Sequence, residues 1–290
     1  MTLLPIEDTR GLWRGLLIAV STAVFVFLIA PILVIIPLSF NAEPYFTFTP
    51  GMLRLQSQAF SLRWYEGFFQ EPRWLVATGN SLFVATASTV LATTLGTMAA
   101  LGLRDEHLPG RHAIRGLILA PMIVPIIITA AGTYMVFSVV RLVDSLTGLI
   151  IAHTVLGVPF VVVTVSASLT GFDQTLERAG LILGAPPFLV FRRITLPLIL
   201  PGVMAGAVLA FVSSLDEVVV ALFITPSPQF YTVPRQMWSG LREQISPTIL
   251  AVATLWIVLS TCLLVTLLML RRYAERLRAG APALEPEPAE

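Results

Sequence analysis

The chain has 290 residues, of which 56% are hydrophobic and only 12% are charged, whereas soluble domains carry about 25% charged residues. Its net charge of +1 gives no basic excess for nucleic acid, its single cysteine excludes an internal disulfide, and its three histidines lack metal-ligand spacing. The composition therefore indicates a membrane protein without a metal centre.

Six apolar runs are each long enough to cross a bilayer, which takes about 20 residues. The first is too long for the core of a signal peptide and lacks a small-residue cleavage site, so we expect an uncleaved span. The prediction is an all-α membrane protein with a polar N-terminus at 1–14, a transmembrane region at 15–272 and a disordered, charged tail at 273–290. The six expected spans are roughly 15–39, 75–103, 116–140, 146–168, 198–224 and 249–270.

Particular side chains refine these elements. Residues 60–69 are predicted to form a short amphipathic helix at the headgroup level, as a membrane anchor or as part of a docking surface for an external partner. The span at 75–103 is rich in small residues, which predicts a buried helix. His153 lies inside the fourth span; hydrogen bonding within the bundle is the favoured interpretation, and a place along a transport path is the alternative.

The segment 170–197 separates two spans and is too polar to be one itself, because its charged residues would be costly at bilayer depth. Its pattern predicts a helix, a break and a second helix. Thr170 is the expected cap of the first helix, and Gly184 with the following prolines is expected to end it. The apolar residues 181–183 near the tip would need a partner protein.

Arginine counts predict the orientation of the chain. Six spans place both termini on one side of the membrane, and with the N-terminus inside, twelve arginines lie inside against six outside. Since cytoplasmic loops carry the excess of positive charge, we expect both termini and the 170–197 loop in the cytoplasm.

Two carboxylates lie within the fifth span. If that span is one continuous helix, Glu217 shares a face with Gly202, Gly206 and Ser213, and Asp216 lies at its edge. No basic residue of the chain is expected at the same depth, so a cation passing along this face would supply the missing charge. The alternative is that the two carboxylates pair with an arginine or hydroxyl of a second subunit, or that they are hydrated at the outer opening of the pathway.

Eight residues of the 170–197 loop follow a recognisable order and spacing: Glu177, Ala179, Gly184, Ala185, Phe191, Ile194, Leu196 and Pro197. With these residues the loop resembles the EAA loop of type I ABC importer permeases. The loop departs from the family pattern at Arg178, where the family usually has alanine. In that family the loop is a coupling helix that inserts into a groove of the ATP-hydrolysing subunit, so the resemblance implies a docking role here.

The stretches 214–220, 232–238 and 246–247 resemble the spermidine/putrescine branch of these permeases. The resemblance implies a permease in the bacterial inner membrane that forms half of the pathway for a small cationic solute, most simply a polyamine. It implies a second homologous permease, two ATPase subunits that bind ATP and Mg²⁺, and a periplasmic substrate-binding protein. Related branches carry opines, amino-acid derivatives, phosphonates or iron.

The candidate residues form two groups. For the ATPase-coupling loop they are Glu177, Arg178, Ala179, Leu181, Gly184, Ala185 and Pro187, and for the substrate pathway Ser213, Ser214, Asp216 and Glu217. No catalytic residue and no cofactor is expected in the chain, which has no phosphate-binding Gly-x-x-x-x-Gly-Lys motif.

Two alternatives to an importer permease are a self-sufficient secondary carrier and an intramembrane hydrolase. A secondary carrier would usually show an internal repeat of spans, which the sequence does not show. A hydrolase would need a nucleophile with its base, and His153 has no clear partner in the sequence.

Overall fold

The computed structural model describes residues 6–171, 173–243 and 246–279. Every regular element in these ranges is helical, apart from an isolated bridge between Asn41 and Phe60. The helices are α1 (Ile6–Leu38), α2 (Pro50–Leu53), η1 (Ser57–Ala59), α3 (Arg63–Gln70), α4 (Pro72–Gly102), α5 (Arg111–Ile123), α6 (Ile126–Val139), α7 (Leu146–Thr170), α8 (Gln174–Ile182), α9 (Pro187–Val190), the π-helix η2 (Phe191–Thr195), α10 (Leu196–Asp216), α11 (Val219–Ile224), η3 (Pro228–Phe230), α12 (Val233–Glu243) and α13 (Thr248–Ala279).

These residues divide into two compact units, one within 1–71 and 244–258 and the other within 72–243 and 259–290. In the first unit, the polar segment after α1 folds around the buried side chain of Asn41, whose amide donates to the carbonyls of Tyr45 (3.1 Å) and Thr47 (3.0 Å). The indole of Trp64 donates to the carbonyl of Asn41 at 2.8 Å, which ties α3 to this turn. α3 is the amphipathic helix predicted at 60–69.

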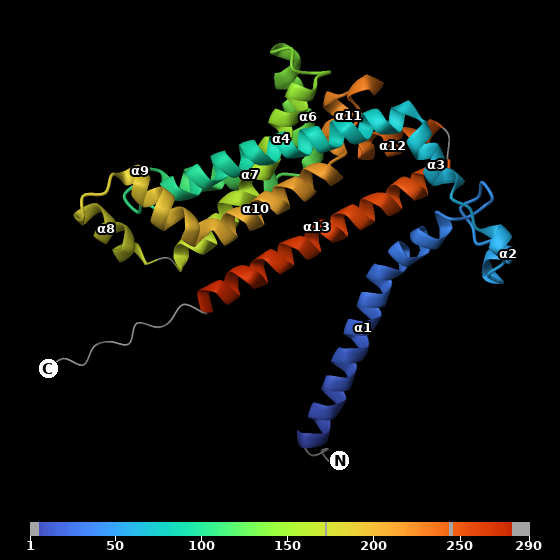
Figure 1. The fold of residues 1–290 in the computed structure, drawn as a ribbon, viewed down its shortest axis with the longest axis horizontal. Helices are drawn as coiled ribbons and strands as arrows, with labels where there is room; N and C mark the ends of the chain where they lie inside the picture. The colour runs from blue at the N-terminus through green and yellow to red at the C-terminus, as the bar shows by residue number, and fades with distance from the viewer. Residues whose placement is uncertain (1–5, 172, 244–245, 280–290) are drawn as a thin grey trace, which may run out of the picture. The chain divides into compact units, whose positions relative to one another are not determined.

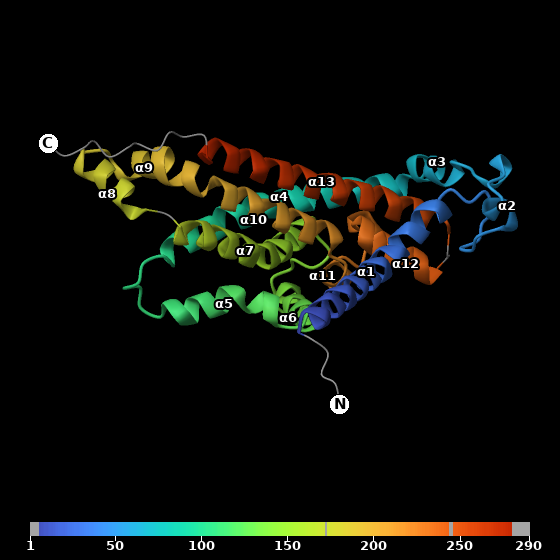
Figure 2. The ribbon, with the colours of Figure 1, turned by 90° about the horizontal axis from the view of Figure 1, so that it is seen from below.

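The second unit is built around α4, α7 and α10, which lie side by side in both views (Figures 1 and 2). Small residues permit this close packing. A Cβ added to Gly206 of α10 would lie 2.7 Å from the Cα of Val161 on α7, and one added to Gly202 would lie 2.7 Å from the carbonyl oxygen of Thr164. The face of the fifth span predicted to carry Gly202 and Gly206 therefore packs against α7.

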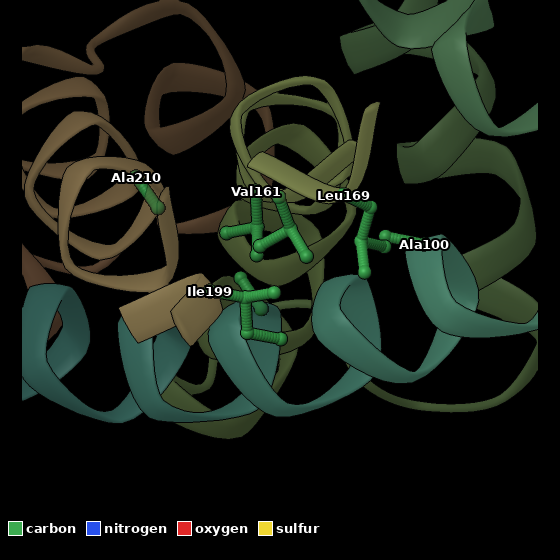
Figure 3. Packing of buried hydrophobic residues seen from close by; sticks show 7 residues of the cluster. Ala100, Val161, Leu169, Ile199 and Ala210 are labelled. Carbon is green, nitrogen blue, oxygen red and sulfur yellow. The ribbon is translucent and has the colours of Figure 1, made fainter. Parts of the chain in front are cut away.

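The core of this bundle is a row of apolar side chains from the three helices. Figure 3 shows Val161 and Leu169 of α7 pointing toward Ile199 of α10 and Ala100 of α4, with Ala210 further along α10. All of these residues are buried. The bundle is thus one packed unit with α8 at one end and α12 at the other (Figure 1).

Five described helices are long and apolar enough to cross a membrane, or six spans if the bent pair α5–α6 counts as one. The third expected span, 116–140, is this pair, and its helices meet at 107° where Pro125 follows Val124. A proline disfavours a helical conformation in the residue before it, which explains the break there. The five spans are Trp13–Leu38, Pro72–Gly102, Leu146–Thr170, Pro187–Asp216 and Thr248–Thr266.

The expectation that 198–224 forms one continuous helix is wrong, because α10 ends at Asp216 and α11 begins at Val219. Glu217 between them has extended backbone angles, φ −71° and ψ 123°. At the C-terminal end of the chain, α13 runs to Ala279, past residue 273 where the sequence places the start of the tail. Residues 280–290 of that predicted tail lie outside the described residues.

Candidate functional site

The 170–197 loop contains the predicted helix, break and second helix. The expected cap is wrong: Thr170 is the last residue of α7, and the carboxylate of Asp173 instead caps α8 by accepting from the backbone N–H of Thr175 at 2.9 Å. This hydrogen bond lowers the pKa of Asp173. Gly184 follows α8 with φ +83°, a left-handed conformation that favours glycine, and α9 starts at Pro187.

Glu177 on α8 accepts three side-chain hydrogen bonds. Its Oε1 accepts hydrogen bonds from Nη1 of Arg104 (3.2 Å) and from Oγ1 of Thr195 (2.5 Å), and its Oε2 accepts from Nη2 of Arg104. The hydrogen bonds from Arg104 lower the pKa of Glu177, and that from Thr195 adds to the effect while partial burial opposes it. Glu177 is therefore an anion paired within its own chain.

The tip of the loop is apolar and exposed. The side chains of Ile182 and Leu183 are the most open, at 85% and 86%, followed by Phe188 at 72% and Leu181 at 47%. Such a contiguous apolar surface is typical of a site that contacts another protein. Of the remaining predicted loop residues, Ala185 is half-buried, and those exposed are Arg178, Ala179, Gly184 and Pro187.

A cavity of about 750 Å³ lies between the 104–107 turn, α8 and the segment 187–195. Arg104, Glu177 and Thr195 line it together with Arg178 and His107. Gly180 of α8 packs against α9 and η2. A Cβ added to Gly180 would lie 3.1 Å from Cδ1 of Ile194 and 3.2 Å from Cγ2 of Val190.

The two membrane carboxylates have different environments. Asp216, the last residue of α10, is exposed, and Ser213 one turn earlier is half-buried. Glu217 is buried, and its carboxylate accepts from the backbone N–H groups of Val220 (2.7 Å) and Ala221 (3.0 Å), the first turn of α11. Glu217 therefore starts α11 in the manner of a helix cap.

Glu217 also has a partner that the sequence did not indicate. Nε2 of the buried His153 on α7 lies 3.4 Å from Oε2 of Glu217, an ion-pair distance without hydrogen-bond geometry. Nδ1 of His153 shares a hydrogen bond with Oγ of Ser214 at 2.7 Å, and Ser88 of α4 donates to Ser214 at 3.2 Å. The expectation that no basic residue lies at this depth overlooked His153 as a neighbour of Glu217, whereas the expected hydrogen bonding of His153 within the bundle is confirmed.

The structure brings the loop residues together at one end of α10 and the pathway candidates at its other end. With 21 residues at 1.5 Å each, these ends are roughly 30 Å apart. Sequence reasoning missed Arg104 and Thr195, and it had no signal for the first, which is 73 residues from Glu177 in the chain.

Comparisons with known proteins agree with this architecture. Residues 92–279 match the family model described as "Binding-protein-dependent transport system inner membrane component". The chain is 32% identical over 251 residues to the spermidine/putrescine transport system permease protein PotC of Escherichia coli K12, covering 87% of this chain and 92% of PotC. It is 33% identical over 264 residues to the putrescine transport system permease protein PotI of the same organism, covering 88% of each.

A solved structure supports the fold. A chain of a bacterial ABC transporter involved in the import of the acidic polysaccharide alginate superposes with a TM-score of 0.66 at 14% identity, covering 93% of this chain and 99% of that one. The predicted ABC importer permease fold is confirmed. The chain therefore belongs to the binding-protein-dependent inner membrane components of ABC importers, multi-pass permease subunits that are not themselves catalytic and that assemble with ATPase and binding-protein partners.

Proposed function

We propose that this permease forms half of an import pathway for a polyamine, such as putrescine or spermidine. The observation that carries the proposal is its similarity over most of its length to PotC and PotI, two permeases named for these solutes. Polyamines are cations, and the exposed carboxylate of Asp216 at the end of α10 has the charge that a cation requires.

Within the predicted pathway group, burial divides the four residues into two pairs. Ser213 and Asp216 are three residues apart on α10 and are both at least partly open, so they are the pair that contacts the solute. Ser214 and Glu217 are buried and hydrogen-bonded inside the bundle. Their role in the pathway is to hold the end of α10 in place.

The coupling loop docks onto an ATPase subunit through its exposed tip. Four large apolar side chains there would lose their contact with water in a protein groove, which favours association. They are Leu181, Ile182, Leu183 and Phe188. The full assembly contains a second homologous permease, two ATPase subunits that bind ATP and Mg²⁺, and a periplasmic substrate-binding protein. The termini of this chain are cytoplasmic, as the twelve-to-six distribution of its arginines favours.

The test is ATP hydrolysis by the co-expressed complex in lipid, with its binding protein, for putrescine and spermidine against neutral and anionic solutes. Polyamines are expected to stimulate hydrolysis. An ion pair open to water contributes up to about 1 kcal/mol, so Asp216→Asn is expected to weaken the apparent polyamine affinity by about fivefold.

The matched control is Asp216→Glu, which keeps the charge and is expected to retain most of the stimulation. Stimulation by an anionic or neutral solute instead of a polyamine would overturn the proposed substrate. Equal polyamine stimulation in Asp216→Asn and the unaltered protein would remove Asp216 from the pathway.

A further inference from the structure

A basic cavity lies between the end of α4, the start of α5 and the end of α7. Its volume is about 330 Å³, within the size range of small-molecule sites. Of the described residues that line it, three are arginines (Arg104, Arg111 and Arg115) and one is a carboxylate, Glu106. We propose that this cavity binds a phosphate group, which an anionic lipid of the cytoplasmic leaflet supplies. The site does not depend on the identity of the transported solute.

Two of the three arginines are open to an anion. Arg104 is paired with Glu177, so its charge is already balanced. In the part of the chain that the structure describes, no carboxylate lies within salt-bridge distance of Arg111 or Arg115. Arg111 acts on the exposed Asp105 only as the smallest of the effects that lower the pKa of that carboxyl. Arg111 and Arg115 are four residues apart on α5, so their guanidinium groups lie on one face of the helix.

The first turn of α5 carries positive charge where a helix favours negative charge. The partial positive charge of a helix N-terminus stabilises acidic residues, but the first turn of α5 has none and begins with Arg111. Gly110 before it has φ +71° and no side chain that could cap the helix. An anion in the adjoining cavity would offset this repulsion, and so the charges of α5 agree with the charges that line the cavity.

The place of the cavity at the ends of membrane spans favours a lipid headgroup as the source of the phosphate. α4 and α7 are candidate spans that end at Gly102 and Thr170, so the cavity lies at the border of the hydrocarbon core. The half-buried Ser166, one turn before the end of α7, adds a hydroxyl that can donate to a phosphate oxygen. Basic pockets between membrane helices on the cytoplasmic side are a recognised setting for anionic headgroups.

The surface proposed to contact the ATPase leaves this cavity open. Gln174, the first residue of α8, lines the cavity, whereas the exposed apolar tip begins at Leu181. These residues are seven positions apart on α8, roughly 10 Å at 1.5 Å each. Figure 2 shows α8 and the turn before α5 at the same end of the bundle of α4, α7 and α10. A lipid and an ATPase subunit can therefore be bound at the same time.

The test is native mass spectrometry of the co-expressed complex in detergent, titrated with phosphatidylglycerol or with phosphatidylcholine. We expect phosphatidylglycerol to bind more tightly at one site for each copy of this chain. Arg111→Gln and Arg115→Gln are each expected to weaken that binding by about fivefold, the effect of one arginine near an anionic surface. Arg14→Gln is the matched control, because it removes an exposed arginine that does not line the cavity, and it is expected to leave the affinity unchanged.

A second variant leaves all the arginines in place. Ser166→Leu puts a larger apolar side chain into the cavity and is expected to weaken phosphatidylglycerol binding without a change of charge. Thermal unfolding of this variant in phosphatidylcholine shows whether it is folded. Inorganic phosphate added to the titration distinguishes the two sources of the phosphate group: we expect it to compete with phosphatidylglycerol only weakly, since it has no acyl chains.

Equal phosphatidylglycerol affinities in Arg111→Gln, Arg115→Gln and Arg14→Gln would overturn the site. Binding of inorganic phosphate that Arg111→Gln weakens, together with equal binding of the two lipids, would keep the phosphate site and overturn the lipid as its source. A complex that holds phosphatidylglycerol at this cavity but is not stimulated by polyamines would refute the proposed substrate alone.

Discussion

Replacing Glu217 tests whether this carboxylate is structural. Its side chain is 4% exposed and accepts from two backbone N–H groups at the start of α11, at 2.7 and 3.0 Å. A buried donor left without a partner costs about 1–3 kcal/mol. Glu217→Ala leaves two such donors and is therefore expected to destabilise the protein by about 2–6 kcal/mol, whereas Glu217→Gln, which keeps one acceptor oxygen, costs about 1–3 kcal/mol.

The assay is thermal unfolding of the purified complex followed by tryptophan fluorescence, with Asp216→Asn as the neighbouring control. We expect the midpoint to fall in the order Asp216→Asn, Glu217→Gln, Glu217→Ala, because exposed substitutions usually change stability by no more than about 0.5 kcal/mol. If Glu217→Ala unfolds at the temperature of Asp216→Asn yet loses polyamine stimulation, Glu217 contacts the solute and the assignment of a helix-starting role is refuted.

Three further predictions concern the bundle and the loop. Ser214→Ala removes the partner of Nδ1 of His153 and is expected to cost about 1 kcal/mol in the same unfolding assay, with no added loss when His153→Gln is already present. Gly206→Ala forces a methyl group against the backbone of α7 and is expected to lower the free energy of unfolding by about 1–3 kcal/mol. The control Gly79→Ala, where an added Cβ has nothing within 4 Å, is expected to be neutral. Equal unfolding midpoints for the two variants would contradict the packing of α10 on α7. Because the folded-state pKa of Glu177 is lowered from 4.5, its contribution to stability is complete above that pH and is lost as the pH falls through the lower folded value. Stability measured from pH 7 to pH 3 is therefore expected to fall more steeply in the unaltered protein than in Glu177→Gln.

The spans were predictable because the length and apolarity of a run decide whether a helix can cross a bilayer. The breaks were harder to predict. The sequence predicts one span at 116–140, although Pro125 disfavours a helical conformation at Val124, and the 107° turn also depends on how α6 packs against α11. The end of α10 at Asp216 was not visible, because a glutamate is compatible with a continuing helix and only its contacts with Val220 and Ala221 show that it begins a new one.

The candidate site shows the same limit. The loop motif identified Glu177 from local spacing alone. Its partner Arg104 is 73 residues away, and the distance between His153 and Glu217 is set by the packing of α7 on α10. Contacts between residues far apart in a single sequence leave no periodicity that could reveal them.

The π-helix η2 places one extra residue in the chain directly before α10. Its hydrogen bonds run from residue i to i+5, so the turn at Phe191–Thr195 holds one residue more than an α-helical turn would. Deleting Arg193 would allow the turn to become α-helical, and because the π-turn already accommodates its extra residue within one turn, Val190 would keep nearly the same orientation relative to α10. The face that receives Gly180 of α8 would then still point toward α8. The π-turn therefore tolerates the loss of one residue with the loop still in register with the bundle, whereas one residue inserted into the regular turns of α10 would rotate the loop by about 100°.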